Sequence, residues 1–430
     1  MRCRLVAILL IVALLAACEP GSAPTTSSAP TIVANASSVG PLLLWHGWSG
    51  GDRQALGRLV DQYNRQQSDG RIVLQSVPLA SFAAELRAAV AAGSGPHLIL
   101  IPNTWIGGLA EAGALLPLDD LITAQETDSL LPVTLAGAQA RDADGTLRLY
   151  GAPVRFDTIA LYYNAANLTA PPSDTATMFA IGRGLSDPDA QPPIWGLALN
   201  LSHDNMIGYL YAFDGRIFDD EGRVALGTTG RNGAERWLSW LIELQNDTRI
   251  LARSESSILV DRELKDGRAI MTFDWAHQIG VYRGLWGDQV GIAPLPRLSE
   301  ADQAPRPYVR TDVLAINNLA GANERVAAAR FIRFMIGDEA QAVLLQSDMQ
   351  PASRTLALSG DSPQEIAARV FRAQAEQGIP MSNSTTRAFV EQEIKRMQRQ
   401  ALLGLTTPAD AVTEADRRLR ERLEPSSPTP

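Results

Sequence analysis

The chain has 430 residues, of which 46% are hydrophobic, and it carries a net charge of -9 with only two cysteines. This acidic balance disfavours nucleic acids and anionic surfaces as partners. The sequence contains no P-loop, no HExxH motif and no Cys/His cluster, so it predicts neither a cofactor nor a metal site. The length is ample for two lobes, each with its own hydrophobic core.

The N-terminus has the features of an exported chain. Two arginines precede an apolar run over residues 5–15, which is shorter than the roughly 20 residues of a membrane span but fits the apolar part of a signal peptide. The tetrapeptide Leu-Ala-Ala-Cys at 15–18 resembles the lipobox of bacterial lipoproteins. This resemblance implies a signal peptide at 1–17 and a lipid on the thiol of Cys18. The alternative is an ordinary secretory signal with an incidental cysteine.

Residues 18–40 predict a lipid-anchored flexible stalk, and residues 424–430 predict a disordered tail. Both segments are rich in proline and small polar residues, which cannot bury enough apolar surface to offset the entropy of ordering. Cys3 would leave with the signal peptide. The folded part would then contain no cysteine, so its stability must come from core burial rather than from disulfides.

The first half of the folded region alternates between strands and helices. Residues 42–46, 71–77 and 98–101 are apolar or β-branched runs that predict buried strands. Residues 52–67 and 81–93 carry apolar side chains at helical spacing. Strands that alternate with helices indicate βαβ units and a parallel sheet, so the predicted fold class is α/β.

The second half is more mixed. Residues 145–151 and 219–224 predict hairpins with Asp/Gly turns, and residues 271–275 predict a strand that leads into a loop. Ser362 followed by a proline and then by Glu365 is a capping box at the start of a helix. The chain therefore ends in helices, without an internal repeat.

Eight segments resemble, in chain order, those of the extracellular solute-binding proteins that feed ABC importers, in particular the maltose-type or family 1 group. The second segment contains AAGSGPHL, in which His97 replaces the aspartate of the family's AAGxGPDL signature. The eight segments span residues 44–50, 91–113, 115–120, 150–164, 211–220, 267–272, 291–296 and 378–383.

The resemblance implies a two-lobed fold like that of periplasmic binding proteins, of the type II, maltose-binding-like class, with a hinge and a ligand cleft between the lobes. Carried over by order, lobe one would comprise 41–155 plus 313–349, and lobe two 156–312 plus 350–423. The implied function is capture of a mono- or oligosaccharide outside the cytoplasm for delivery to a membrane permease. The resemblance further implies that the protein is a monomer and not an enzyme. It would be held at the outer face of the cytoplasmic membrane or in the periplasm.

The resemblance also places candidate ligand contacts in loops and at crossings between the lobes. Carboxylates and amides suit the hydroxyl edge of a sugar, and aromatic rings suit its C–H faces. The candidate ligand-binding residues are Trp48, Ser49, Asn103, Thr104, Trp105, Phe156, Asp157, His203, Asn205, Asp274, Trp275, Arg310 and Asp312.

One departure from the maltose-type pattern concerns specificity. The segment 381–383 is followed by Arg387, Phe389 and Glu391, without the stacking tryptophan of the maltose-binding members. This leaves sugars other than maltodextrins, and non-sugar solutes, open as ligands.

A hydrolase is the alternative from another class. Residues 47–51 fit the G-x-S-x-G nucleophile elbow, which would make Ser49 the nucleophile of a secreted, lipid-anchored enzyme. The triad order then requires a late histidine, but the last of the four histidines is His277. The glycines are better explained by a loop whose backbone approaches a ligand. A tethered scaffold without a small ligand is disfavoured by the eight ordered segments.

Overall fold

The computed structural model describes residues 39–227, 232–253 and 257–424. The expected signal peptide, Cys18 and nearly all of the stalk lie outside these residues, as do residues 425–430 of the tail. Within the described ranges, no helix has both the length and the apolar character needed to cross a membrane.

The first lobe is built on a mixed sheet in which strands from distant parts of the chain are neighbours. The strand order is β13-β6-β12-β3-β1-β2, with β14 beside β12. The strands are β1 (Leu42–His46), β2 (Ile72–Ser76), β3 (Leu98–Pro102), β6 (Ala152–Asp157), β12 (Tyr308–Ile316), β13 (Gln350–Pro351) and β14 (Ile379–Pro380). Strand β1 is parallel to β2 and β3, as predicted. Strand β12, from later in the chain, is antiparallel to both β3 and β6, so the complete sheet is mixed.

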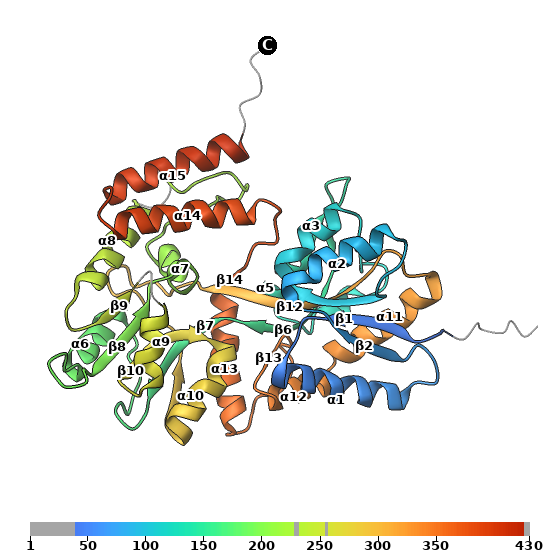
Figure 1. The fold of residues 1–430 in the computed structure, drawn as a ribbon, viewed down its shortest axis with the longest axis horizontal. Helices are drawn as coiled ribbons and strands as arrows, with labels where there is room; N and C mark the ends of the chain where they lie inside the picture. The colour runs from blue at the N-terminus through green and yellow to red at the C-terminus, as the bar shows by residue number, and fades with distance from the viewer. Residues whose placement is uncertain (1–38, 228–231, 254–256, 425–430) are drawn as a thin grey trace, which may run out of the picture. The chain divides into compact units, whose positions relative to one another are not determined.

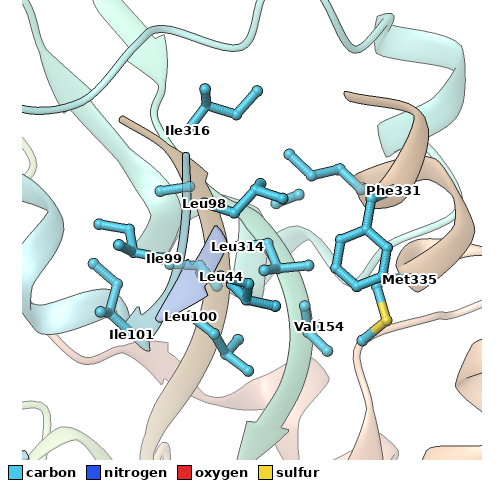
Figure 2. Packing of buried hydrophobic residues seen from close by; sticks show 14 of the residues in the cluster. Leu44, Leu98, Ile99, Leu100, Ile101, Val154, Leu314, Ile316, Phe331 and Met335 are labelled. Carbon is cyan, nitrogen blue, oxygen red and sulfur yellow. The ribbon is translucent and has the colours of Figure 1, made fainter. Parts of the chain in front are cut away.

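Helices cover this sheet. They are α1 (Gly50–Gln66), α2 (Leu79–Ala91), α3 (Ile106–Glu111), α4 (Ala124–Thr127), α5 (Pro132–Ala138), α11 (Ala322–Ile336) and α12 (Asp338–Gln346). Figure 2 shows the core between the sheet and α11, where Phe331 and Met335 lie near Val154 and Leu314. In β3 the first four residues are all buried, as expected for a strand that is covered on both faces.

The second lobe has a sheet of its own, with the order β11-β7-β10-β8-β9. Its strands are β7 (Ile159–Asn164), β8 (Trp195–Asn200), β9 (Leu251–Arg253), β10 (Ala269–Trp275) and β11 (Val290–Ala293). Its helices are α6 (Thr175–Leu185), α7 (His203–Ala212), α8 (Gly233–Asn246), α9 (Ser257–Lys265), α10 (Ile279–Trp286), α13 (Pro363–Gln377), α14 (Arg387–Leu402) and α15 (Pro408–Leu423). Figure 1 shows α14 and α15 side by side near α8.

The strand that enters the second lobe follows directly on a strand of the first. Strand β6 ends at Asp157 and β7 begins at Ile159, so Thr158 alone separates them. The Thr158 hydroxyl donates to the carbonyl of Tyr308, at the start of β12, over 2.9 Å. The two crossing segments are therefore tied together where the chain leaves the first sheet.

The structure agrees with the sequence predictions of a turn, a helix cap and a buried strand residue. The Asp142–Thr146 turn joins the hairpin of β4 (Gln139–Arg141) and β5 (Leu147–Leu149). Ser362 caps α13 and accepts from the amide of Glu365, as the capping box predicts. Trp45, in the strand 42–46 that the sequence predicts to be buried, packs against Phe82 and is itself buried.

A close approach of α6 to β8 gives a stability prediction. A Cβ on Gly196 of β8 would lie 2.1 Å from the carbonyl oxygen of Gly182 in α6. A Cβ on Gly184, which is also in α6, would meet nothing within 4 Å. Gly196→Ala is expected to lower the free energy of unfolding by about 1–3 kcal/mol through overpacking. Gly184→Ala should leave it unchanged or raise it by about 0.5–1 kcal/mol through helix propensity. Urea unfolding measures both, and equal effects would contradict the prediction.

Candidate functional site

A cavity of about 860 Å³ lies between the two lobes. The first lobe contributes the loop after β1 and the start of α1, and the second contributes the segment after β10, the start of α10 and the start of α14. The crossing strands β6 and β12 form part of the wall between them. This volume lies in the ordinary range for small-molecule sites.

Four charged residues on β6 and β12 alternate in sign on one face of the crossing strands. The antiparallel register sets Arg155 directly opposite Asp312, and Asp157 directly opposite Arg310. Residues two apart along a strand share a face, so all four side chains point the same way, and all four line the cavity. We call these four residues the hinge quartet.

One half of the hinge quartet is anchored to the first lobe. Arg155 Nε donates to Asp312 Oδ2 over 2.7 Å, and Nη1 donates to Asp52 Oδ2 over 2.6 Å. Its guanidinium lies 4.3 Å above the Trp48 ring, whose Nε1 also donates to Asp312 Oδ2 over 2.7 Å. Burial opposes the charge on Arg155, but Asp312 and Asp52 together raise its pKa above the ordinary value. Arg155 is therefore a fixed cation.

The other half is anchored to the second lobe in a similar way. The guanidinium of Arg310 lies 4.2 Å above the ring of Trp275 and forms an ion pair with Asp157. Asp157 also accepts from the backbone amide of His277 over 3.2 Å, and its Oδ2 is 2.8 Å from His277 Nδ1. Burial would raise the pKa of Asp157, but the hydrogen bond from His277 and the charge of Arg310 lower it to about 2. The same hydrogen bond raises the pKa of His277.

The sequence-predicted residues divide into those that border the cavity and those that do not. Trp48, Ser49, Thr104, Phe156, Asp157, Arg310 and Asp312 border the cavity. Asn103, Trp105, His203, Asn205, Asp274 and Trp275 are not among its lining residues. Phe156 borders the cavity but is only 3% exposed, because its ring packs in an apolar cluster.

Two of the residues outside the lining, Asn103 and Trp105, make packing and hydrogen-bond contacts instead. The Asn103 side chain is fully buried, donates to the carbonyl oxygens of Gly137 and Met381, and accepts from the amide of Thr311. Asn103 thus links three segments that are distant in the sequence. Trp105 packs with its ring centroid 5.5 Å from that of Phe82.

The other residues outside the lining belong to the second lobe. Asn205 donates to the carbonyl of Phe273 over 3.4 Å. Asp274 accepts from the hydroxyl of Tyr282 over 2.8 Å, and burial raises its pKa to about 6. The ring of His203 is 2% exposed and packs on Tyr308. Neither of its nitrogens has a hydrogen-bond partner among the described residues.

Five charged residues of the cavity wall were missed by the sequence prediction: Asp52, Arg155, His277, Asp348 and Arg387. Asp204, between the candidates His203 and Asn205, and Glu391, which follows 381–383, also line the cavity. Arg155 had a detectable signal, because it lies two residues before Asp157 on a predicted crossing strand. Arg387 and Glu391 are four apart at the start of α14 and form an ion pair. Asp348 forms an ion pair with Arg283 of α10, which no sequence spacing indicates.

The cavity wall carries many charged side chains among apolar ones, and its charges are largely paired. Six carboxylates and three guanidinium groups line it. Arg283 and Lys395, outside the lining, approach Asp348 and Glu391. The described residues contain no group of three or more His, Cys, Asp or Glu side chains arranged to hold a metal ion.

The chain belongs to the bacterial extracellular solute-binding protein family, whose model matches residues 58–368. This family is one of binding proteins rather than enzymes, and it places the folded part outside the cytoplasm. Ser49 of the elbow-like sequence is the residue before α1, and its hydroxyl makes no hydrogen bond to a histidine within the described ranges. The family explains the ordered segments without a catalytic serine.

A curated relative is the maltotriose-binding protein of Pyrococcus abyssi, which is 26% identical over 297 residues. The match covers 69% of this chain and 62% of the relative, which is less than two thirds of the relative's length.

Solved structures show the same two-lobed α/β fold. A cyclo/maltodextrin-binding protein in complex with maltotetraose has a TM-score of 0.77 at 18% identity, over 91% of this chain and 100% of the other. The cyclic alpha-maltosyl-1,6-maltose binding protein of Arthrobacter globiformis has a TM-score of 0.75 at 18% identity, over 89% and 99%. A maltose-binding protein of Listeria monocytogenes has a TM-score of 0.74 at 15% identity, over 90% and 99%.

Proposed function

We propose that this protein captures a carbohydrate in the cavity between its lobes and delivers it to the permease of an ABC importer. The observation that carries this proposal is the hinge quartet. A sugar hydroxyl both donates and accepts hydrogen bonds, so it suits a surface on which Arg155 alternates with Asp157, and Arg310 with Asp312. A purely cationic or anionic ligand would suit only half of these groups.

The names of the relatives support the same ligand class. The curated relative is described as a maltotriose-binding protein, and the structural neighbours were solved with maltotetraose or maltose, or are named for a cyclic maltosyl sugar. Their shared ligand chemistry is that of glucose units. The segment after 381–383 lacks the stacking tryptophan of the maltose-type pattern, so the proposal names the carbohydrate class and not a maltodextrin.

A thermal-shift screen tests the carbohydrate proposal. The probes are D-glucose, maltose, maltotriose, trehalose and myo-inositol, with amino acids and polyamines as the contrasting set. A ligand that binds only the folded state stabilises it, by about 2.7 kcal/mol at a concentration of 100 times Kd. A rise in Tm with at least one carbohydrate is expected. A rise in Tm with amino acids or polyamines but with none of the carbohydrates would show that the ligand is a non-sugar solute.

We also propose that the lobes close on the ligand as two bodies, 41–155 plus 313–349 and 156–312 plus 350–423. Thr158, the single residue between β6 and β7, lies three residues after the first boundary and supports this, because hinges in such proteins are a few residues that absorb backbone rotation. The sheet pairing differs from these bounds in that residues 156–157, the start of β12, and strands β13 and β14 pair within the first lobe's sheet. The radius of gyration measured by X-ray scattering should fall when the carbohydrate binds. An unchanged value at saturation would contradict closure.

We propose further that a lipid on Cys18 holds the protein at the membrane through the stalk, which keeps it at a high local concentration near its permease. Palmitate labelling in the native host should label the wild type and the Cys3→Ser variant equally. Cys18→Ser should abolish the labelling and release the protein from the membrane fraction. Labelling that survives Cys18→Ser would disprove the anchor.

A further inference from the structure

Each lobe places one tryptophan next to the hinge quartet, and an arginine of the quartet covers each. Arg155 lies 4.3 Å from the ring centre of Trp48, and Arg310 lies 4.2 Å from that of Trp275. The two tryptophans, which also pack in the apolar cores of their lobes, are only 7% and 8% exposed. A sugar ring cannot stack on the arginine-covered face of either indole unless the arginine moves away.

Both arginines are held by carboxylates as well as by the tryptophan rings. Arg155 donates from Nε to Asp312 and from Nη1 to Asp52. Arg310 donates from Nη2 to Asp157. Within the described residues, Nη2 of Arg155 and Nη1 of Arg310 have no hydrogen-bond acceptor. A guanidinium is a planar fork of five N–H donors, so each arginine keeps fixed donors available on a residue that lines the cavity.

The neighbouring charges restrict the ligand that these donors can take. Each arginine lies against one or two carboxylates, namely Asp52 and Asp312 for Arg155 and Asp157 for Arg310. An anionic ligand would meet these carboxylates at close range and be repelled. An uncharged hydroxyl can accept from the arginine and donate to the adjacent carboxylate at the same time.

We propose that Trp48 and Trp275 serve as platforms for Arg155 and Arg310 rather than for sugar rings, and that the ligand is an uncharged carbohydrate bound by its hydroxyl edge to these two guanidinium groups. The proposal rests on the carbohydrate function proposed above and deepens it. Arg155 and Arg310 are then the specificity-determining residues. Cation–π contact fixes each guanidinium plane, and the carboxylates fix its rotation.

Arg310→Ala tests the proposal, because the two binding modes predict effects of opposite sign. If Arg310 contacts the ligand, its removal lowers the affinity for the carbohydrate, by about 10- to 100-fold for a lost charged hydrogen bond. If the sugar must displace Arg310 to stack on Trp275, the removal uncovers the indole and raises the affinity. Isothermal titration with the carbohydrate that gives the largest thermal shift measures the sign directly.

Arg306→Ala is the matched control. Arg306 also lies over an aromatic ring, that of Tyr211 at 5.9 Å, but it does not line the cavity. Its removal should leave the affinity unchanged. Arg310→Lys keeps the charge and loses the planar fork, so it should also bind the carbohydrate at least about tenfold more weakly than the wild type. This variant replaces Arg310→Ala in the test if the alanine variant does not fold.

The outcomes separate this proposal from the function on which it rests. Weaker binding by both Arg310 variants, with the control unchanged, supports hydroxyl-edge recognition. Equal or tighter binding by Arg310→Ala overturns it and leaves carbohydrate capture intact. A wild-type protein that binds none of the carbohydrates overturns both.

Discussion

Asp312→Ala is expected to lower carbohydrate affinity by about 100-fold and the free energy of unfolding by about 3 kcal/mol. Asp312 Oδ2 accepts from both Trp48 Nε1 and Arg155 Nε, each over 2.7 Å. Its removal leaves the indole N–H of Trp48 and the Nε–H of Arg155 without their acceptor, and breaking a mostly buried ion pair from one side costs about 3–5 kcal/mol. Asp52 still pairs with Arg155, so we expect the lower end of this range.

The affinity loss follows from the same contacts, because Asp312 positions two side chains that border the cavity and is itself a hydrogen-bond acceptor there. Titration calorimetry and urea unfolding measure the two effects separately. Asp220→Ala is the control, since Asp220 also pairs with an arginine, Arg216, but its side chain is 88% exposed. Exposed pairs contribute little, so the control should match the wild type. If Asp312→Ala binds with wild-type affinity, the hinge quartet is not part of the binding site.

Acid destabilisation is expected to depend strongly on His203. Burial, and then the nearby charge of Lys395, lowers the pKa of this histidine to about 4 in the folded protein. The unfolded chain binds the proton near its ordinary pKa of about 6.5, so between these values the unfolded state holds more protons. Stability should therefore fall as the pH drops from about 6.5 to 4, by about 3 kcal/mol from this residue alone.

His203→Phe should abolish that part of the pH dependence, because phenylalanine fills a similar volume and can keep the edge contact with Tyr308. The measurement is urea unfolding of both proteins at pH 7, 5.5 and 4, with the difference between them as the readout. His277→Gln provides a contrast of opposite sign. The pKa of His277 is raised by its bond to Asp157, so its stabilising contribution is present below pH 6.5 and is lost as the pH rises through its folded pKa. Parallel curves for wild type and His203→Phe would refute the prediction.

Local signals in the sequence predicted much of the fold. The helix expected over 52–67 is observed as α1 (Gly50–Gln66), and the strand expected over 42–46 is β1. Both depend on side-chain periodicity and burial, which act over a few residues. The family resemblance predicted the two lobes and indicated the loop of Trp48 as part of a site. Alternation along β6 would also have placed Arg155 on the same face as Asp157.

Only the tertiary structure decided how the site is assembled. Strand β12 inserts between β3 and β6 from about 150 residues further along the chain, and its register alone sets Asp312 against Arg155 and Arg310 against Asp157. A shift by one residue would turn all of β12's side chains to the opposite face. The sequence by itself determined that the chain is a two-lobed binding protein with charged residues and tryptophans near its crossings. Which arginine covers which tryptophan was decided by long-range strand pairing, because contacts between distant segments leave no periodic signal in either segment.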